Sequence, residues 1–511
     1  MSPQRFVRDS IGLAAAQFAV RAMIIARTVI AARLLGPQVF GAWNALQLLM
    51  DYGALAPLGT QQGLDQLVPR RIVDGDAGAG ARLKRAGLTS VLILSLLYAS
   101  ACVAYFLGSS GNLMSFWGIA GLLVAMAIVV QINWASYSTG VLRSHGNIGA
   151  VSRWFFLQGM IGALLGLLLI RWFGGWGLLW GWFAGTAIAF VWTQWEARRV
   201  APFRPLISAE SVELFRVGFP MFFFAGAALI VRNLDRLIIL RYLGTKELGY
   251  YSLAVTAMTL VMYLPDSATF VFYPRLIQRF RENGDRPEAV QAPVLTVLRV
   301  LTVVTPALGG VAYFFVRDMV AVLLPNFFLG APAVQVMCFT GAALCITNLA
   351  AIVLMTLGRQ LWLIPMALIS IVAFAVADVL ALRSGHGITG VAWATLIAYT
   401  ATGAVTLALA LTALRLPISA VARRVLASLW GLAVAVALAP LTDRFAPWAN
   451  GGSALPRILH AVVGSATFLV AYALLVGPQL RGLGIRQIVS ELNLPFAGLF
   501  GRPGNGGGTA P

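Results

Sequence analysis

The sequence predicts an all-α polytopic membrane protein, with about fourteen transmembrane helices in two six-helix lobes and two extra C-terminal helices. The first observation is composition: 59% of the 511 residues are hydrophobic and only 11% are charged. The second is that the apolar runs have the length, roughly 20 residues, that crosses a bilayer core. The third is an internal repeat, described below. The runs lack two-residue alternation, so helices rather than barrel strands are expected.

The expected spans follow one another with short connections. We place them at about residues 11–33, 38–58, 86–107, 114–137, 152–172, 177–197, 217–243, 247–270, 292–316, 331–357, 360–382, 388–414, 421–440 and 457–476.

The net charge of +19 is distributed as in a membrane protein rather than a nucleic-acid-binding protein. Most Lys and Arg residues fall in alternate connections, such as Arg70 to Arg85 and Arg275 to Arg286. The positive-inside rule then places these connections and both termini in the cytoplasm. We therefore expect a multi-pass membrane protein that binds no nucleic acid.

The repeat relates the first half of the chain to the second. Arg33, Gly36 and Gly41 recur as Arg241, Gly244 and Gly249, each at an offset of 208 residues. Because each lobe has an even number of spans, the lobes should be related by an axis along the membrane normal. Two similar bundles are typical of transporters that work by alternating access. The expected parts are an N-lobe at 1–200, a C-lobe at 201–415, two helices at 416–480 and a cytoplasmic amphipathic helix with a disordered tail at 481–511.

Several ionisable residues lie inside the expected spans, where a charge costs a few kcal/mol unless it faces a cavity or a partner. Arg232, Asp235 and Arg236 share the seventh span, and Arg27 occupies the repeat position of Asp235. If the lobes face each other, these residues and Arg21 line one cationic cavity, and arginine forks suit phosphate groups. The alternative is that Arg232–Asp235 and Asp51–Arg27 are buried pairs that only fix helix packing.

Other polar residues in the spans are candidates for ion coupling or for sugar contacts. Asp51, Asp266 and Asp378 are candidates for binding a coupling H+ or Na+. Gln131 and Asn133 would hydrogen-bond a sugar or, alternatively, a neighbouring helix. The three cysteines show no metal-ligand spacing, and no nucleotide-binding loop is present, so neither a metal nor a cofactor is expected.

At these residues the chain resembles polysaccharide flippases of the Wzx type, in the multidrug/oligosaccharidyl-lipid/polysaccharide (MOP) exporter superfamily. The resemblance rests on Ala32 to Gly41, Asn233 to Arg236, Tyr242 to Ala254 and Phe272 to Leu276. It implies a non-enzymatic protein that moves an undecaprenyl-diphosphate-linked oligosaccharide from the inner to the outer leaflet of a bacterial plasma membrane. It also implies a cationic cavity, with Arg21, Arg27, Arg232 and Arg236 as counterparts. A polysaccharide polymerase or assembly protein is a candidate partner, and action without such a partner is the alternative.

Three other functions compete with this one. A lipid II flippase would share the fold and the charge pattern. A drug or cation antiporter would need a more acidic cavity than this sequence offers. A membrane-embedded glycosyl- or acyltransferase would need a cluster of catalytic His or carboxylate residues, and the sequence shows none.

Overall fold

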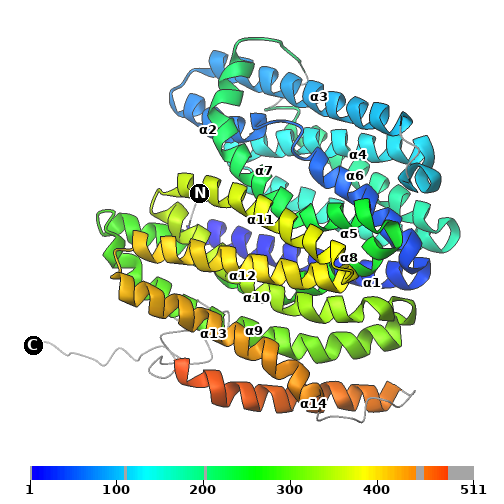
Figure 1. Ribbon diagram of the computed structural model, residues 1–511. Helices are drawn as coiled ribbons and strands as arrows, with labels where there is room; N and C mark the ends of the chain where they lie inside the picture. The colour runs from blue at the N-terminus through cyan, green and yellow to red at the C-terminus, as the bar shows by residue number, and fades with distance from the viewer. Residues whose placement is uncertain (1–2, 109–111, 201–203, 445–453, 481–511) are drawn as a thin grey trace, which may run out of the picture. The chain divides into compact units, whose positions relative to one another are not determined.

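The computed structural model describes residues 3–108, 112–200, 204–444 and 454–480, and these residues form helices and short connections (Figure 1). The predicted amphipathic helix and tail at 481–511 lie outside the described residues. The α-helices are α1 (Pro3–Gly53), α2 (Thr60–Val73), α3 (Ala77–Leu107), α4 (Asn112–Ser144), α5 (Ile148–Phe173), α6 (Gly175–Ala197), α7 (Glu210–Tyr242), α8 (Thr245–Glu282), α9 (Gln291–Leu323), α10 (Ala331–Thr356), α11 (Leu363–Arg383), α12 (Gly387–Ala413), α13 (Ile418–Arg444) and α14 (Ala454–Val476). Short 3-10 helices are η1 (Pro287–Val290), η2 (Pro325–Gly330), η3 (Gln360–Trp362) and η5 (Gly477–Leu480).

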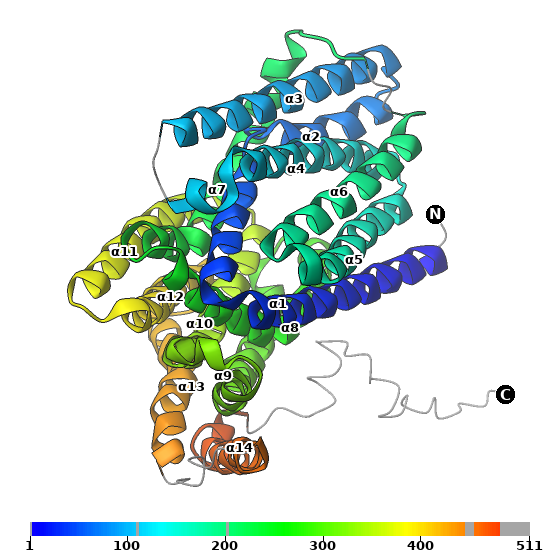
Figure 2. The same cartoon turned by 90° about the vertical axis from the view of Figure 1, so that its right-hand side faces the viewer.

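The all-α membrane fold is confirmed, whereas the number of spans differs from fourteen. Eleven described helices are long and apolar enough to cross a membrane, and α8 makes twelve if its bent halves form one span. The first two expected spans correspond to the two helical parts of α1, which meet at a kink where Gly36 adopts the non-helical angles φ 69° and ψ 172° (Figure 2). Helix α6 is absent from the eleven, and its many Gly and Trp residues lower its mean hydropathy.

The chain forms two compact units, which we describe separately. Unit 1 contains residues 1–252 and 323–327, and unit 2 contains residues 253–322 and 328–511. This division differs from a lobe boundary at 200/201, because α7 packs on α2 and α3. Glu213 and Glu210 in the first turn of α7 pair with Arg71 and Arg82 at 3.2 and 2.9 Å.

Unit 1 is held together by closely packed helices, and α5 and α6 lie side by side (Figure 2). A Cβ atom at Gly177, Gly181 or Gly185 of α6 would overlap the backbone of α5. Glycines at this interface therefore allow the two backbones to approach, as small residues do in membrane helices.

In unit 2, a buried charge network joins α9, α13 and α14. His460 of α14 places Nδ1 2.9 Å from Asp318 Oδ2 and Nε2 3.1 Å from Asp443 Oδ1. Arg317 of α9 donates to the second oxygen of Asp443 at 2.7 Å. Both ring nitrogens of His460 thus lie within hydrogen-bonding distance of a carboxylate oxygen. The network links the two C-terminal helices to α9.

Replacement of His460 by glutamine is expected to lower the free energy of unfolding by about 2 kcal/mol, because a single amide group cannot contact both Asp318 and Asp443 as the two ring nitrogens do. Unfolding in mixed micelles measures this difference. The matched control is His386→Gln at an exposed helix start, which should change the free energy by less than about 0.5 kcal/mol. Equal stability of the two variants would contradict this role of the network.

Candidate functional site

The centre of the candidate site is Arg236, which joins α7 to the second half of α1. Its Nη1 donates to Asn233 Oδ1 at 3.2 Å, and its Nη2 donates to Asn44 Oδ1 of α1 at 3.4 Å. Its Nε is buried and makes no hydrogen bond to the described residues. The guanidinium group is therefore held by neutral amides through long hydrogen bonds.

Asp235, next to Arg236, is buried and already engaged. Its Oδ2 accepts a 2.7 Å hydrogen bond from the Tyr251 hydroxyl of α8, and its Oδ1 accepts one from the Arg236 backbone N–H at 2.7 Å. Asp51 of α1 is half-buried and lies close enough to Arg236 for charge–charge attraction. The structure thus brings Asp51, Asp235 and Arg236 together within unit 1.

Arg27 is buried in a different setting. Its Cζ lies 4.9 Å from the ring centre of Trp182 on α6 and 5.9 Å from that of Trp43 on α1. A cation over an aromatic face is stabilised by the ring quadrupole. Asp51 therefore has Arg236 rather than Arg27 as the basic neighbour, in contrast to the Asp51–Arg27 pair considered from the sequence.

The offset of 208 residues relates these contacts to one another. Arg27 and Trp43 are the repeat positions of Asp235 and Tyr251, and both pairs are in contact. In the first repeat, these two positions thus hold an arginine that lies against a tryptophan ring. In the second repeat, they hold a carboxylate that accepts a hydrogen bond from a tyrosine hydroxyl. The sequence repeat is also a repeat of contacts.

Arg27→Met is expected to keep the stability of the protein within about 1 kcal/mol of wild type. The variant loses the contact with the two rings, a contribution of about 0.5–2 kcal/mol, but it also loses the desolvation cost of a buried charge. Unfolding in mixed micelles tests this expectation. A loss above 3 kcal/mol would mean that the charge of Arg27 has a partner that stabilises the fold.

The elements that carry the cluster also meet at their ends. At one end, Cβ atoms at Gly41 and Gly249 would overlap the carbonyl oxygens of Thr245 and Pro37. Gln38 adds a hydrogen bond from Nε2 to Thr245 Oγ1 at 3.1 Å. Because 37 and 41 are the repeat positions of 245 and 249, this is a two-fold-like contact between equivalent segments. We call it the hairpin contact.

A second close approach lies further along, between α2 and α7. A Cβ atom at Gly218 would overlap the Gly59 carbonyl oxygen, and one at Gly63 would overlap the Leu214 carbonyl oxygen. Gly59 also has φ 93°, which favours glycine. We call this the α2–α7 contact. Along the chain from α1 to α2, Asn44 and Asp51 lie after Gly41 of the hairpin contact and before Gly59 of the α2–α7 contact. Along the chain from α7 to α8, Arg236 lies after Gly218 of the α2–α7 contact and before Thr245 of the hairpin contact.

The remaining predicted residues lie elsewhere. Arg232 is exposed on α7, and the side chain of Arg21 on α1 lies outside the described residues. Asp266 and Asp378 belong to unit 2, where the first is half-buried on α8 and the second fully buried on α11.

Gln131 and Asn133 bond to neighbouring helices, which was the alternative to a sugar contact. Gln131 Oε1 accepts from the Thr186 hydroxyl at 3.0 Å. Asn133 Nδ2 donates to the Gly53 carbonyl at 3.0 Å and to Ser95 Oγ at 2.9 Å.

Sequence reasoning missed Asn44, Asn233 and Tyr251 as partners of the charged residues. Asn233 lies in the quoted Asn233–Arg236 segment, and Tyr251 follows from Trp43 by the repeat offset. Asn44 carried a weaker signal, since it is one of three neutral amides in the same expected span, with Gln38 and Gln47.

Comparison with known proteins now decides the family. A family model described as "Polysaccharide biosynthesis protein" matches residues 30–331, more than half of the 511 residues. The chain belongs to this family. No curated protein matches the chain.

Solved structures show the fold of this family member. An inward-facing multidrug resistance MATE family transporter of the MOP superfamily matches with a TM-score of 0.64 at 15% identity, covering 79% of this chain and 95% of that one. The lipid II flippase MurJ, in an inward closed conformation, matches with a TM-score of 0.64 at 14% identity, covering 91% and 99%. A MOP superfamily transporter from Pyrococcus furiosus matches with a TM-score of 0.51 at 13% identity, covering 83% and 95%. The fold is that of MOP superfamily membrane transporters.

Proposed function

We propose that this protein is a flippase for an undecaprenyl-diphosphate-linked oligosaccharide. It moves this lipid from the inner to the outer leaflet of a bacterial plasma membrane by alternating access. The observation that carries the proposal is Arg236, a cation within the membrane span α7 that is held by amide oxygens. The membership in a polysaccharide biosynthesis family supports the choice of a glycan substrate.

The setting of Arg236 suits a diphosphate. Its two amide partners accept at 3.2 and 3.4 Å, longer than the roughly 2.7–2.9 Å of charge-assisted bonds. An incoming diphosphate therefore replaces weak neutral partners with stronger charged ones. Asp235 does not compete for the guanidinium side chain by hydrogen bonding, because its two oxygens accept from Tyr251 and from the backbone.

Transport requires the cluster to be reached from each side in turn. The hairpin contact and the α2–α7 contact lie on either side of it along the same helices, and we propose that they open alternately. Movement of the anionic headgroup is coupled to the membrane potential or to an H+ or Na+ gradient, with Asp51, Asp266 and Asp378 as the candidate carboxylates for an ion. We further propose that both termini are cytoplasmic and that a polysaccharide polymerase receives the product.

A lipid II flippase is the second candidate, since the fold matches that of MurJ over 91% of this chain. Both substrates carry an undecaprenyl diphosphate, so the cluster around Arg236 serves either. A carrier of cationic drugs is less favoured, because the chain belongs to a family of polysaccharide biosynthesis proteins.

Competition binding distinguishes these candidates. Purified protein in nanodiscs is loaded with a radiolabelled undecaprenyl-diphosphate oligosaccharide and challenged with undecaprenyl diphosphate, lipid II or ethidium. We expect undecaprenyl diphosphate to displace the label and ethidium to leave it bound. If lipid II displaces the radiolabel at a tenfold lower concentration than the unlabelled undecaprenyl-diphosphate oligosaccharide does, the lipid II flippase is favoured. Displacement by ethidium alone overturns the proposal.

A further inference from the structure

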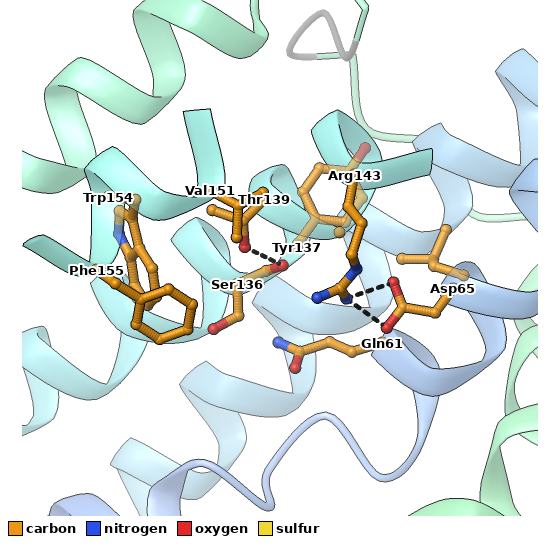
Figure 3. Close-up of a pocket in the computed structure, with 11 residues that line it drawn as sticks. Gln61, Asp65, Ser136, Tyr137, Thr139, Arg143, Val151, Trp154 and Phe155 are labelled. Atoms are coloured by element: carbon orange, nitrogen blue, oxygen red, sulfur yellow. Dashed lines mark hydrogen bonds and ion pairs between the residues drawn. The ribbon is translucent and has the colours of Figure 1, made fainter. Parts of the chain in front are cut away.

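A cavity of about 240 Å³ lies within unit 1, between α2, α4 and α5 (Figure 3). It is separate from the cluster around Arg236 and has two chemically different walls. One wall carries Asp65 of α2 and Arg143 of α4, with Gln61 and Ser136 beside them. The other carries Trp154 and Phe155 of α5. The predicted topology places this end of the helices on the cytoplasmic side.

The polar wall is electrically neutral but rich in hydrogen-bonding groups. Arg143 Nη2 donates to Asp65 Oδ1 and Oδ2 at 2.7 and 2.6 Å. The second terminal nitrogen of Arg143 points away from Asp65, toward Ser136 and Gln61 (Figure 3). Gly140 leaves room for the carboxylate, since a Cβ there would lie 3.2 Å from Asp65 Oδ1. The pair thus offers donors and acceptors together.

The aromatic wall is partly fixed and partly open. Trp154 is only 6% exposed and packs with Ala135 and Ala189. Its neighbour Phe155 is 47% exposed, and the two ring centres lie 4.7 Å apart in an edge-to-face arrangement. The buried tryptophan holds the exposed ring beside the cavity.

These walls select the chemistry of the occupant. A free anion gains little, because Asp65 neutralises Arg143 and repels it. A purely apolar occupant would desolvate the ion pair without compensating hydrogen bonds. A sugar ring satisfies both walls, since its C–H face packs on an aromatic ring while its hydroxyls donate and accept. The volume lies just below the range of drug-sized sites and suits one ring.

We propose that this cavity is a subsite for one sugar ring of the lipid-linked oligosaccharide. This proposal rests on the proposed function and adds a sugar-binding site to it, on the side from which the substrate enters. The neutral polar wall makes it a site for an uncharged sugar.

Saturation-transfer difference NMR on purified protein in nanodiscs tests the subsite with free sugars. The probes are methyl glucoside, methyl galactoside and N-acetylglucosamine, and glycerophosphocholine tests the rival occupant, a lipid headgroup. We expect at least one sugar to receive saturation, mainly on its ring C–H protons. That signal should fall at least fivefold in Asp65→Asn and in Phe155→Ala.

The matched control is Arg153→Gln, an exposed arginine on α5 that does not line the cavity. It should keep the sugar signal within about twofold of wild type, because surface substitutions usually change a free energy by less than about 0.5 kcal/mol. An unchanged signal in both cavity variants, the absence of any sugar signal, or a signal from glycerophosphocholine alone overturns the subsite.

The two proposals fail separately. Arg236→Gln should abolish flipping and leave the sugar signal intact. If the protein flips no lipid-linked oligosaccharide but the sugar signal depends on Asp65, the proposed function is wrong and the sugar site stands. If flipping depends on Arg236 but no sugar signal is found, only the subsite is wrong.

Discussion

Replacement of Arg236 by glutamine is expected to lower the rate of flipping at least a hundredfold while the protein stays folded. Glutamine still donates to an amide oxygen but loses the charge and the planar fork that suit a diphosphate. Losing a desolvated charge pair costs about 2–5 kcal/mol, and a hundredfold change corresponds to about 2.7 kcal/mol. The measurement is the initial rate of flipping of a fluorescent undecaprenyl-diphosphate oligosaccharide in proteoliposomes.

The control for this experiment is Arg216→Gln. Arg216 is an exposed arginine on the same helix, α7, outside the cluster. It should flip at a rate within twofold of wild type. If Arg236→Gln flips as fast as Arg216→Gln, Arg236 is a packing residue and the diphosphate binds elsewhere.

A covalent bridge across the hairpin contact is expected to stop flipping completely. Gln38 and Thr245 are joined by a 3.1 Å side-chain hydrogen bond, so cysteines at these positions suit a short bis-methanethiosulfonate linker, which joins the two thiols through disulfide bonds that a reductant cleaves. If the contact opens during each cycle, the bridged protein is held in one state. Flipping is measured before bridging, after bridging and after reduction, in a chain whose Cys102, Cys338 and Cys345 are replaced by alanine. Reduction should restore the rate.

The control bridge joins Gln131 and Thr186, the same pair of residue types with a 3.0 Å hydrogen bond between α4 and α6. These helices belong to one closely packed bundle, so the bridge should leave flipping nearly unchanged. Equal inhibition by both bridges would indicate general damage. Full activity of the protein bridged at 38 and 245 would show that the hairpin contact does not open during transport.

Much of the fold follows from the sequence, because apolar length and the repeat are strong signals. The offset of 208 residues predicted that Arg27 and Asp235 are equivalent, and their contacts with Trp43 and Tyr251 bear this out. The number of spans was less certain, because the two helical parts of α1 meet directly at Gly36 with no loop between them and because α6 is rich in glycine and tryptophan.

The direction of each side chain was harder to predict. Helices α7 and α10 are apolar on most faces. The position of a residue along such a helix therefore indicates its depth in the membrane, but it does not indicate which neighbouring helix its side chain contacts. Arg27 therefore gave no sign that it would lie against Trp182, 155 positions away in the sequence. The amides of Asn44 and Asn133 look alike in sequence, yet one holds Arg236 and the other joins three segments of the N-terminal bundle.

The central claim is that this protein flips a lipid-linked oligosaccharide, and wild-type protein in sealed proteoliposomes tests it most directly. A fluorescent undecaprenyl-diphosphate oligosaccharide is incorporated, and the fraction exposed to a membrane-impermeant quencher is followed over time with and without an ion gradient. The account predicts that nearly all of the label becomes accessible with the protein, while about half stays protected in protein-free liposomes. The same protected fraction with and without protein, under every gradient and with lipid II as well, would contradict it.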